Sequence, residues 1–247
     1  PFSMPMFLTC LVAMFMVAMP IIQTGRSNIE ESYGARRSSA STQALLSGDG
    51  KAWEQARKVA WGPQIYGTSF RAVWSETGLF VRFDAVDPSP WYTLTKRDDH
   101  LWTEEVVEIF IDPDGDGRNY AEIEISPHNV VCDLLIFEGA PNVRSDIDWD
   151  HEGLQSKVHP LIGADGEPVG WMAIAILPWS SFATLTAISS VPVPPHDGDV
   201  WRFNIFRIKR PFGPTEPDRD VVYAAWSPPI GPSFHEPAVF RALEFIE

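Results

Sequence analysis

The stretch Val106-Val-Glu-Ile-Phe-Ile-Asp112, followed by Tyr120-Ala-Glu-Ile-Glu-Ile-Ser126, decides the fold class of this chain. In the first run Val107, Ile109 and Ile111 share one face of a strand, because successive side chains of a strand point to opposite sides. The second run repeats this alternation, and the Asp- and Gly-rich residues between the runs are typical of a hairpin turn. The sequence therefore predicts two neighbouring strands.

Short runs of the same kind recur along the chain between clusters of Pro, Gly, Asp and Asn. Ala52–Val59 and Trp179–Leu185 are predicted to form one or two helical turns each. The strands, with polar residues facing outward, predict an all-β fold: an antiparallel β-sandwich of jelly-roll or immunoglobulin-like type, wet on its outer faces. The other predicted strands are Phe70–Trp74, Leu79–Asp84, Val130–Phe137, Gln155–His159, Gly170–Leu177, Val200–Lys209 and Val239–Glu244.

Three segments divide the chain. Residues 1–25 contain an apolar run without charge, which is typical of a signal peptide or a membrane anchor. Residues 26–43 are rich in Ser, Gly and Arg and are predicted to be a flexible linker, and residues 44–247 are predicted to form the single β domain. We expect a secreted, periplasmic or cell-surface anchored protein. The alternative is that the start codon is assigned too far upstream and that the domain itself is cytosolic.

Charge and cysteine content narrow the function classes. The net charge is −14, which argues against nucleic acid as a partner because duplex binding needs a basic face. An acidic surface is compatible with neutral sugars, with divalent cations and with solubility alone. Outside residues 1–25 the sequence holds one cysteine, Cys132. It alternates with apolar neighbours and is expected to be a buried, inert thiol.

Six segments, taken in order, resemble carbohydrate-binding modules of family 9. They are Leu79–Asp87, Leu101–Gly115, Tyr120–Pro127, Gly170–Trp179, Trp201–Arg207 and Ala225–Phe240. Two positions depart from the family pattern: Ile174 replaces a frequent Glu, and Arg241 follows Phe240 where the family has Gly. The resemblance implies a β-sandwich that binds poly- or oligosaccharides without chemistry of its own, ancillary to extracellular polysaccharide degradation. We expect it to act as a monomer.

Sugar binding predicts a particular set of side chains. Flat aromatic rings stack on the apolar side of a pyranose, and polar groups must bond the hydroxyls. Trp74, Trp171 and Trp201 lie within strand patterns and are expected in the core, which leaves the tryptophans of loops as stacking candidates. The predicted ligand-binding residues are Trp91, Trp102 and Trp149 for stacking and Arg82, Asp84 and Arg207 for hydrogen bonds.

A metal site is predicted in the turn that carries Asp112, Asp114 and Asp116. The turn resembles the first half of an EF-hand loop, but position twelve is Ile123 and the flanking segments are strands. Three carboxylates at alternate positions can still collect a hard cation. Since family 9 modules can carry structural calcium, Ca²⁺ is the expected cofactor.

Two other functions stay open. Glu108, Glu122 and Glu124 invite the interpretation of a glycoside hydrolase acting on O-glycosyl bonds, which needs two carboxylates facing one cleft; the alternative is a solvated acidic face. Relatives of this sandwich also bind haem in electron carriers, and Met172 is the one Met after the N-terminal segment that could serve as an axial ligand. The histidines show no zinc-like spacing, and His235 is expected to be structural.

Overall fold

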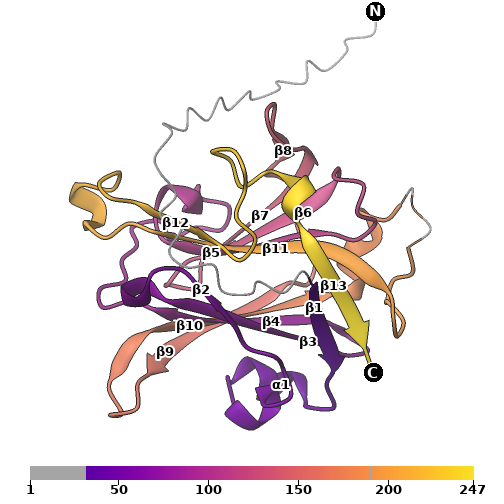
Figure 1. The fold of residues 1–247 in the computed structure, drawn as a ribbon, viewed down its shortest axis with the longest axis horizontal. Helices are drawn as coiled ribbons and strands as arrows, with labels where there is room; N and C mark the ends of the chain where they lie inside the picture. The colour runs from indigo at the N-terminus through magenta and orange to yellow at the C-terminus, as the bar shows by residue number, and fades with distance from the viewer. Residues whose placement is uncertain (1–31, 188, 190) are drawn as a thin grey trace, which may run out of the picture.

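The structure, a computed structural model, describes residues 32–187, 189 and 191–247. The predicted signal peptide or anchor, residues 1–25, and the first part of the predicted linker lie outside these residues. The strands form two facing layers, so the predicted all-β sandwich is confirmed (Figure 1). In Figure 1 the strands β5, β6, β7, β11 and β12 make the upper layer, and β2, β3, β4, β9 and β10 make the lower layer.

Hydrogen bonds connect the two layers into one continuous sheet. The strands β13 (Arg241–Ile246) and β1 (Ser32–Arg37) run down one side of the sandwich and join the layers (Figure 1). From one end the order is β8 (Arg144–Asp146), β7 (Val131–Glu138), β6 (Tyr120–Ile125), β5 (Val106–Asp112), β11 (Val200–Lys209), β13, β1, β3 (Thr68–Trp74), β4 (Gly78–Val86), β10 (Pro168–Pro178) and β9 (Gln155–Ile162), with β12 (Val222–Ala225) beside β11 and β2 (Val59–Trp61) beside β3.

Strand β1 corrects two predictions. Ser32–Arg37 falls within the predicted linker, yet it pairs with β13 and with β3, so the linker prediction is wrong for these residues. Both pairings are parallel, whereas the sequence analysis predicts antiparallel sheets throughout. Tyr33 and Ala35 of β1 are fully buried, and the hydroxyl of Tyr33 donates to the carbonyl of Arg57 over 2.8 Å. The domain therefore begins before residue 44.

Helical structure is short, as predicted. Helix α1 (Thr42–Leu46) begins after Ser41, whose side chain accepts a hydrogen bond from the amide of Ala44, a usual N-cap. The 3-10 helices are η1 (Gly50–Trp53), η2 (Gln64–Tyr66), η3 (Leu101–Thr103), η4 (Trp179–Ala183), η5 (Gly213–Thr215) and η6 (Pro237–Val239). Helix η4 lies where the sequence predicts a turn, and η1 overlaps the start of the other predicted turn.

The main core lies between the two layers and is built by strand alternation. Val107, Ile109 and Ile111 of β5 face it, as predicted, together with Phe203 and Ile205 of β11. The tryptophans assigned to the core from the sequence, Trp74, Trp171 and Trp201, are buried there. Strands β5 and β11 have the predicted ends, because their alternation is strong and turn residues bound them.

The outer faces of the central strands are not wet, contrary to the prediction, although β9 at the end of the sheet alternates exposed and half-buried residues. Every residue of β5 and β6 is buried. Loop residues Leu101, Phe234 and Phe240 cover the outer side of β5, β6, β7 and β11, where they pack on Phe110 and Phe206. On the opposite layer, residues of α1 and η1 cover β3, β4 and β10. Apolar side chains therefore occupy both sides of the central strands, and Cys132 is buried as predicted.

Candidate functional site

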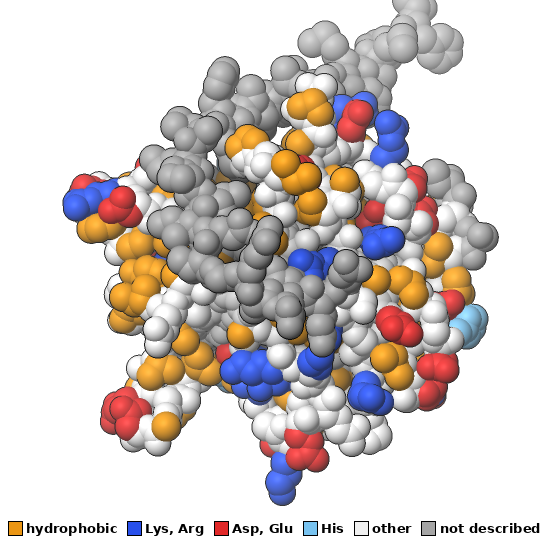
Figure 2. Space-filling view, viewed as in Figure 1, with side chains coloured by type: hydrophobic (Ala, Val, Ile, Leu, Met, Phe, Trp, Pro, Cys, Tyr) orange, Lys and Arg blue, Asp and Glu red, His pale blue; other side chains and the backbone are white. Residues whose placement is uncertain are grey.

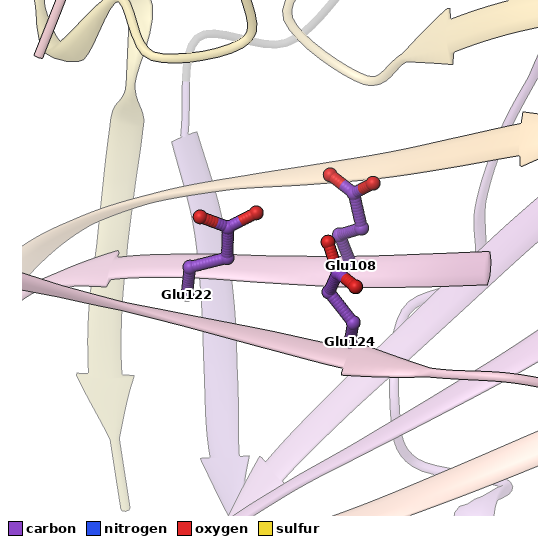
Figure 3. Close-up of side chains that lie close together, drawn as sticks. All are labelled: Glu108, Glu122 and Glu124. Atoms are coloured by element: carbon purple, nitrogen blue, oxygen red, sulfur yellow. The ribbon is translucent and has the colours of Figure 1, made fainter. Parts of the chain in front are cut away.

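Three glutamates stand together on the outer side of the upper layer. Glu108 of β5 pairs directly with Glu124 of β6, and Glu122 lies two residues away on the same side of β6. Figure 3 shows the three side chains leaving neighbouring strands on one side of the sheet. Carboxylate oxygens, one from each residue, lie within 4.8 Å of one another. We call these three residues the acidic cluster.

The acidic cluster is closed off from solvent. The exposed fractions are 1% for Glu108, 5% for Glu122 and 0% for Glu124. Oε2 of Glu108 and both carboxylate oxygens of Glu124 are buried without a hydrogen-bond partner. Burial raises the pKa of Glu122 to about 8. Burial, followed by the charges of the neighbouring carboxylates, raises the pKa of Glu108 and of Glu124 well above the ordinary value. The predicted solvated acidic face is therefore wrong, because loops cover it.

His235 borders the acidic cluster. Its Nε2 lies 3.8 Å from Oε2 of Glu122, and its Nδ1 is hydrogen-bonded to the hydroxyl of Tyr120 at 3.0 Å. Burial lowers the pKa of His235 to about 4, so the imidazole is neutral at physiological pH. Across the described part of the chain, no Lys or Arg forms an ion pair with the three glutamates.

Trp102, from the segment before β5, packs beside the acidic cluster, and further aromatic rings come from the same segment and from the turn after β6. Trp102 of η3 packs on the apolar residues around the glutamates and stacks on His100, with ring centroids 4.5 Å apart. Tyr92 stacks on His128 of the turn between β6 and β7, with centroids 4.0 Å apart. Tyr92, His100 and His128 are exposed, and Trp91 and Trp102 are half-buried. We call these five residues the aromatic surface.

A network of hydrogen bonds fixes this segment. The indole Nε1 of Trp91 donates to the carbonyl of Arg210 over 2.7 Å. The guanidinium of Arg210 donates to the carbonyls of Trp102 and Glu104. The carboxylate of Glu104 accepts from the amide of Thr93 over 2.7 Å. The structure therefore brings together Trp91 and Trp102, two of the three tryptophans predicted to stack on sugar.

The third predicted tryptophan lies elsewhere. Trp149 is half-buried against the main core and meets the ring of His151 edge-on, with centroids 5.7 Å apart. It does not belong to the aromatic surface, and its ligand contact stays a prediction.

Arg82 and Asp84 lie on β4 in the opposite layer. Asp84 accepts from Arg82 and from Arg71, each over 2.8 Å. Arg71 and Arg82 line a shallow hollow of about 340 Å³ beside Trp53 and Lys58. On the face seen in Figure 2, basic side chains stand beside acidic and apolar ones. These two residues cannot serve the same ligand-binding site as Trp102, because the sandwich separates them.

Arg207 is held inside the fold. Its Nη2 donates to Asp87 over 2.8 Å, and Nη1 donates to Tyr66, Thr68 and Val86. Lys209, which is fully buried, bonds Asp87 over 2.9 Å and Glu105 over 2.5 Å. Arg207 is 1% exposed, which leaves no surface for a ligand. The prediction that Arg207 bonds sugar is therefore corrected. We call Asp87, Glu105, Arg207 and Lys209 the ionic network.

The ionic network shapes the pKa values of its acids. Burial alone would raise the pKa of Asp87, but Lys209 and Arg207 outweigh it and hold the pKa below its ordinary value. Burial and the charge of Asp87 raise the pKa of Glu105 to about 8. The network was not predicted from the sequence, although Arg207 and Lys209 share the inward phase of Phe203 and Ile205 along β11.

The loop predicted to bind calcium is ordered by its own hydrogen bonds. The two carboxylate oxygens of Asp112 accept from the amides of Gly115 and Gly117, each over 2.9 Å. Both glycines have positive φ, 68° and 78°, which favours residues without a side chain. Burial raises the pKa of Asp112 to about 7, against the effect of these bonds. Carboxylate oxygens of Asp112, Asp114 and Asp116 lie within 4.8 Å of one another, a donor set that suits a hard cation.

Met172, the residue that motivates the haem alternative, is 7% exposed. It packs in the cluster formed by Trp53, Ile174 and their neighbours beneath α1 and η1. A Cβ added at Gly48 would lie 2.4 Å from its methyl carbon, so this side chain is closely covered by protein. The position of Met172 adds no support for a haem ligand.

The family assignment follows from the fold together with the sequence. A model of carbohydrate-binding family 9 matches residues 40–245, so the chain belongs to this family. A curated relative from Arthroderma benhamiae, called an extracellular protein, is 29% identical over 190 residues, which cover 72% of this chain and 78% of the relative.

Solved structures show the same fold. A Bacteroides uniformis protein, 20% identical, superimposes with a TM-score of 0.62 over 87% of this chain and 99% of its own. A family 9 module from Caldicellulosiruptor kristjanssonii in complex with cellotriose is 15% identical, with a TM-score of 0.59 over 87% of this chain and 93% of its own. A family 9 module from the same organism in complex with glucose is 15% identical, with a TM-score of 0.57 over 87% of this chain and 95% of its own.

The described residues include no helix with both the length and the apolar character needed to cross a membrane.

Proposed function

We propose that this chain is a non-catalytic carbohydrate-binding module, which acts outside the cell as a monomer and holds a poly- or oligosaccharide during its degradation by other proteins. The observation that carries the proposal is membership of carbohydrate-binding family 9 across nearly the whole described domain. The complexes of a structural relative with cellotriose and glucose and the extracellular relative support it.

The aromatic surface is the proposed contact with sugar. A half-buried indole offers a flat apolar face for the C–H side of a pyranose while neighbouring atoms hold it in place. The indole of Trp91 is held by its bond to the carbonyl of Arg210, and the indole of Trp102 is stacked on His100, so little side-chain freedom is lost when a ligand stacks on them. Tyr92, His100 and His128 add exposed polar atoms for the hydroxyls.

Binding is favoured over hydrolysis by the state of the acidic cluster. A glycosidase needs an acid and an ionised carboxylate on opposite sides of a bond, with different pKa values. Here all three carboxyls share one covered environment, and burial raises the pKa of each. An incoming glycosidic bond meets Trp102 and loop residues before it meets the glutamates.

Calorimetric titration with a panel of soluble cello-, xylo-, manno- and β-1,3-gluco-oligosaccharides tests the proposal. We expect saturable binding of one sugar class at one site per chain, and no new reducing ends when the matching polymer is incubated with the protein. Absence of binding across all classes contradicts the sugar-binding proposal. Release of sugar that is abolished by Glu122→Gln contradicts the non-catalytic part.

We also propose Ca²⁺ as a structural cofactor of the loop that carries Asp112, Asp114 and Asp116. The three carboxylates supply hard oxygen ligands, and the loop backbone is already ordered around Asp112. Added Ca²⁺ is expected to raise the melting temperature of chelator-treated protein, and Asp114→Asn/Asp116→Asn should remove this loop's share of the rise. An unchanged calcium response in that variant contradicts the assignment.

A further inference from the structure

We infer that the hollow on the outer side of β3 and β4 is a binding site for the carboxylate of an acidic sugar, a uronic acid residue, with Lys58, Arg71 and Arg82 as its cationic contacts. We call it the basic hollow. Its other lining residues are Gly50, Trp53, Glu54 and Ala56. The basic hollow belongs to the layer opposite the aromatic surface, so it is a second site that does not depend on sugar binding by that surface.

Strand pairing places the three cations side by side. Arg71 of β3 and Arg82 of β4 pair directly across the sheet. Lys58 precedes Val59, the first residue of β2, which pairs with Phe70 next to Arg71. Like charges that stand opposite each other destabilise a sheet, so this row of cations needs anions close to it. On the face drawn in Figure 2, Lys and Arg side chains gather over the lower layer.

The described residues around the basic hollow supply too few acids for this row. Asp84 accepts from Nη1 of Arg71 and from Nε of Arg82, each over 2.8 Å, and Glu54 is the one acidic residue among those that line the hollow. Two carboxylates against three cations leave one positive charge in excess. This excess runs against the net charge of the chain, which is −14. A ligand with a single negative charge would balance it.

Hydrogen-bond donors without a partner indicate that the anion is a carboxylate. Within the described part of the chain, Nε and Nη2 of Arg71 and Nζ of Lys58 form no hydrogen bond or ion pair. A guanidinium presents its N–H groups as a fork that matches the two oxygens of a carboxylate, and a lysine adds a point charge. The Arg71 side chain is 22% exposed and that of Arg82 13%, and this partial burial strengthens their attraction for an anion.

The size and the lining of the basic hollow indicate what carries the carboxylate. Its volume of about 340 Å³ lies at the lower end of the range of small-molecule sites, which suits a ligand of the size of one hexose rather than a bare ion. Trp53 is 1% exposed, so it offers no open ring face, and the lining is mainly polar. A uronic acid combines a polar body of this size with a single negative charge.

The experiment is a nuclear magnetic resonance titration of the intact, isotope-labelled chain at low salt with D-glucuronate and D-galacturonate, and in parallel with D-glucose and inorganic phosphate. We expect the amide signals of Gly50 and Arg71 to shift to saturation with at least one uronate and not with glucose. Arg71→Gln and Lys58→Gln should each weaken uronate binding by about fivefold or more, because each removes a charged donor. The exposed Lys96→Gln, which loses the same charge outside the hollow, is the matched control and should bind like the parent protein.

Lys58→Gln keeps the test independent of folding, because Lys58 is exposed and its removal breaks no ion pair between described residues. Equal uronate affinity in the parent protein and in this variant overturns the inference. Glucose that binds as tightly as the uronates overturns it too, since charge would then be irrelevant, as do phosphate binding without uronate binding and the absence of any binding. Uronate binding that is lost in Trp102→Ala would place the acid on the aromatic surface and also overturn it. Loss of neutral oligosaccharide alone in Trp102→Ala leaves uronate binding at the basic hollow intact, as the inference expects.

Discussion

Two clusters of buried charge lie in this sandwich, one between its layers and one on the outer side of the upper layer, and they are built in opposite ways. The ionic network places Asp87 and Glu105 against Arg207 and Lys209, with N–O distances of 2.5–2.9 Å. The acidic cluster places three glutamates together with no Lys or Arg paired to them in the described part of the chain. The charges of the network are balanced within the protein, although Oε2 of Glu105 and Nε of Arg207 have no hydrogen-bond partner. The acidic cluster has no such balance and needs protons or a cation from outside. The balance of charge therefore distinguishes the ionic network, which is structural, from the acidic cluster, which is part of the candidate functional site.

The largest effect is expected from Lys209→Met. This change leaves Asp87 and Glu105 buried without their shared cation, and the loss of one partner of a buried ion pair destabilises a protein by about 3–5 kcal/mol. Urea denaturation should show this decrease in the free energy of unfolding. The exposed Lys96→Met is the matched control and should change it by less than about 0.5 kcal/mol. A decrease below about 1 kcal/mol for Lys209→Met would show that the network is not what holds these carboxylates.

An intermediate effect is expected from His151, a buried titratable residue outside both clusters. Burial lowers its pKa to about 3, and Nε2 lies 2.5 Å from the hydroxyl of Ser181. In the unfolded chain this histidine has a pKa near 6.5 and binds a proton that the buried imidazole of the folded chain does not bind. Its contribution to stability is therefore fully present above about pH 6.5. It is lost as the pH falls toward about 3.

From pH 7 to pH 5 this loss amounts to about 2 kcal/mol. Between pH 7 and pH 5 the free energy of unfolding should therefore fall by about 2 kcal/mol more in the parent protein than in His151→Gln. Chemical denaturation at the two pH values measures the difference between the proteins, which cancels the titration of all other groups. Parallel pH profiles of the two proteins would contradict the assignment of a neutral buried imidazole.

The smallest effect compares one glutamate from each cluster in chelating buffer. Glu105→Gln removes a partner of Lys209 and should lower the free energy of unfolding, whereas Glu124→Gln removes a carboxyl that must take up a proton in order to be buried and should raise it by about 1 kcal/mol. Urea denaturation of the two variants, side by side, gives the sign of each change. If both variants were destabilised equally, the contrast between the clusters would not hold.

Much of the fold can be predicted from the sequence, for local reasons. The ends of β5 and β11 follow from strong alternation and from the turn residues beside them. The turn at Asn129 can also be predicted from local residues, because its φ of 61° is one that Asn tolerates. In contrast, Ser32–Arg37 carries two apolar residues, Tyr33 and Ala35, and its main partner, β13, lies about 200 residues along the chain. Nothing nearby in the sequence marks it as a strand.

The candidate site is less predictable because loops make it. The alternation of β5 and β6 correctly puts Glu108, Glu122 and Glu124 on one side, but it cannot show that Leu101, Phe234 and Phe240 cover that side. Arg207 illustrates the same difficulty in reverse. Its strand motif suggested a ligand contact, while its partner Asp87 lies 120 residues away in the sequence. Burial of polar groups depends on such distant contacts.

The central claim is that the chain binds sugar on the aromatic surface, and one comparison tests it most directly. The affinity of the intact chain for its preferred oligosaccharide would be measured by calorimetry for the parent protein, Trp102→Ala and Trp149→Ala. Both tryptophans are half-buried, but only the first belongs to the aromatic surface. We predict at least tenfold weaker binding for Trp102→Ala, about 1.4 kcal/mol or more, and unchanged binding for Trp149→Ala. The reverse pattern, or equal losses in both folded variants, would contradict the claim.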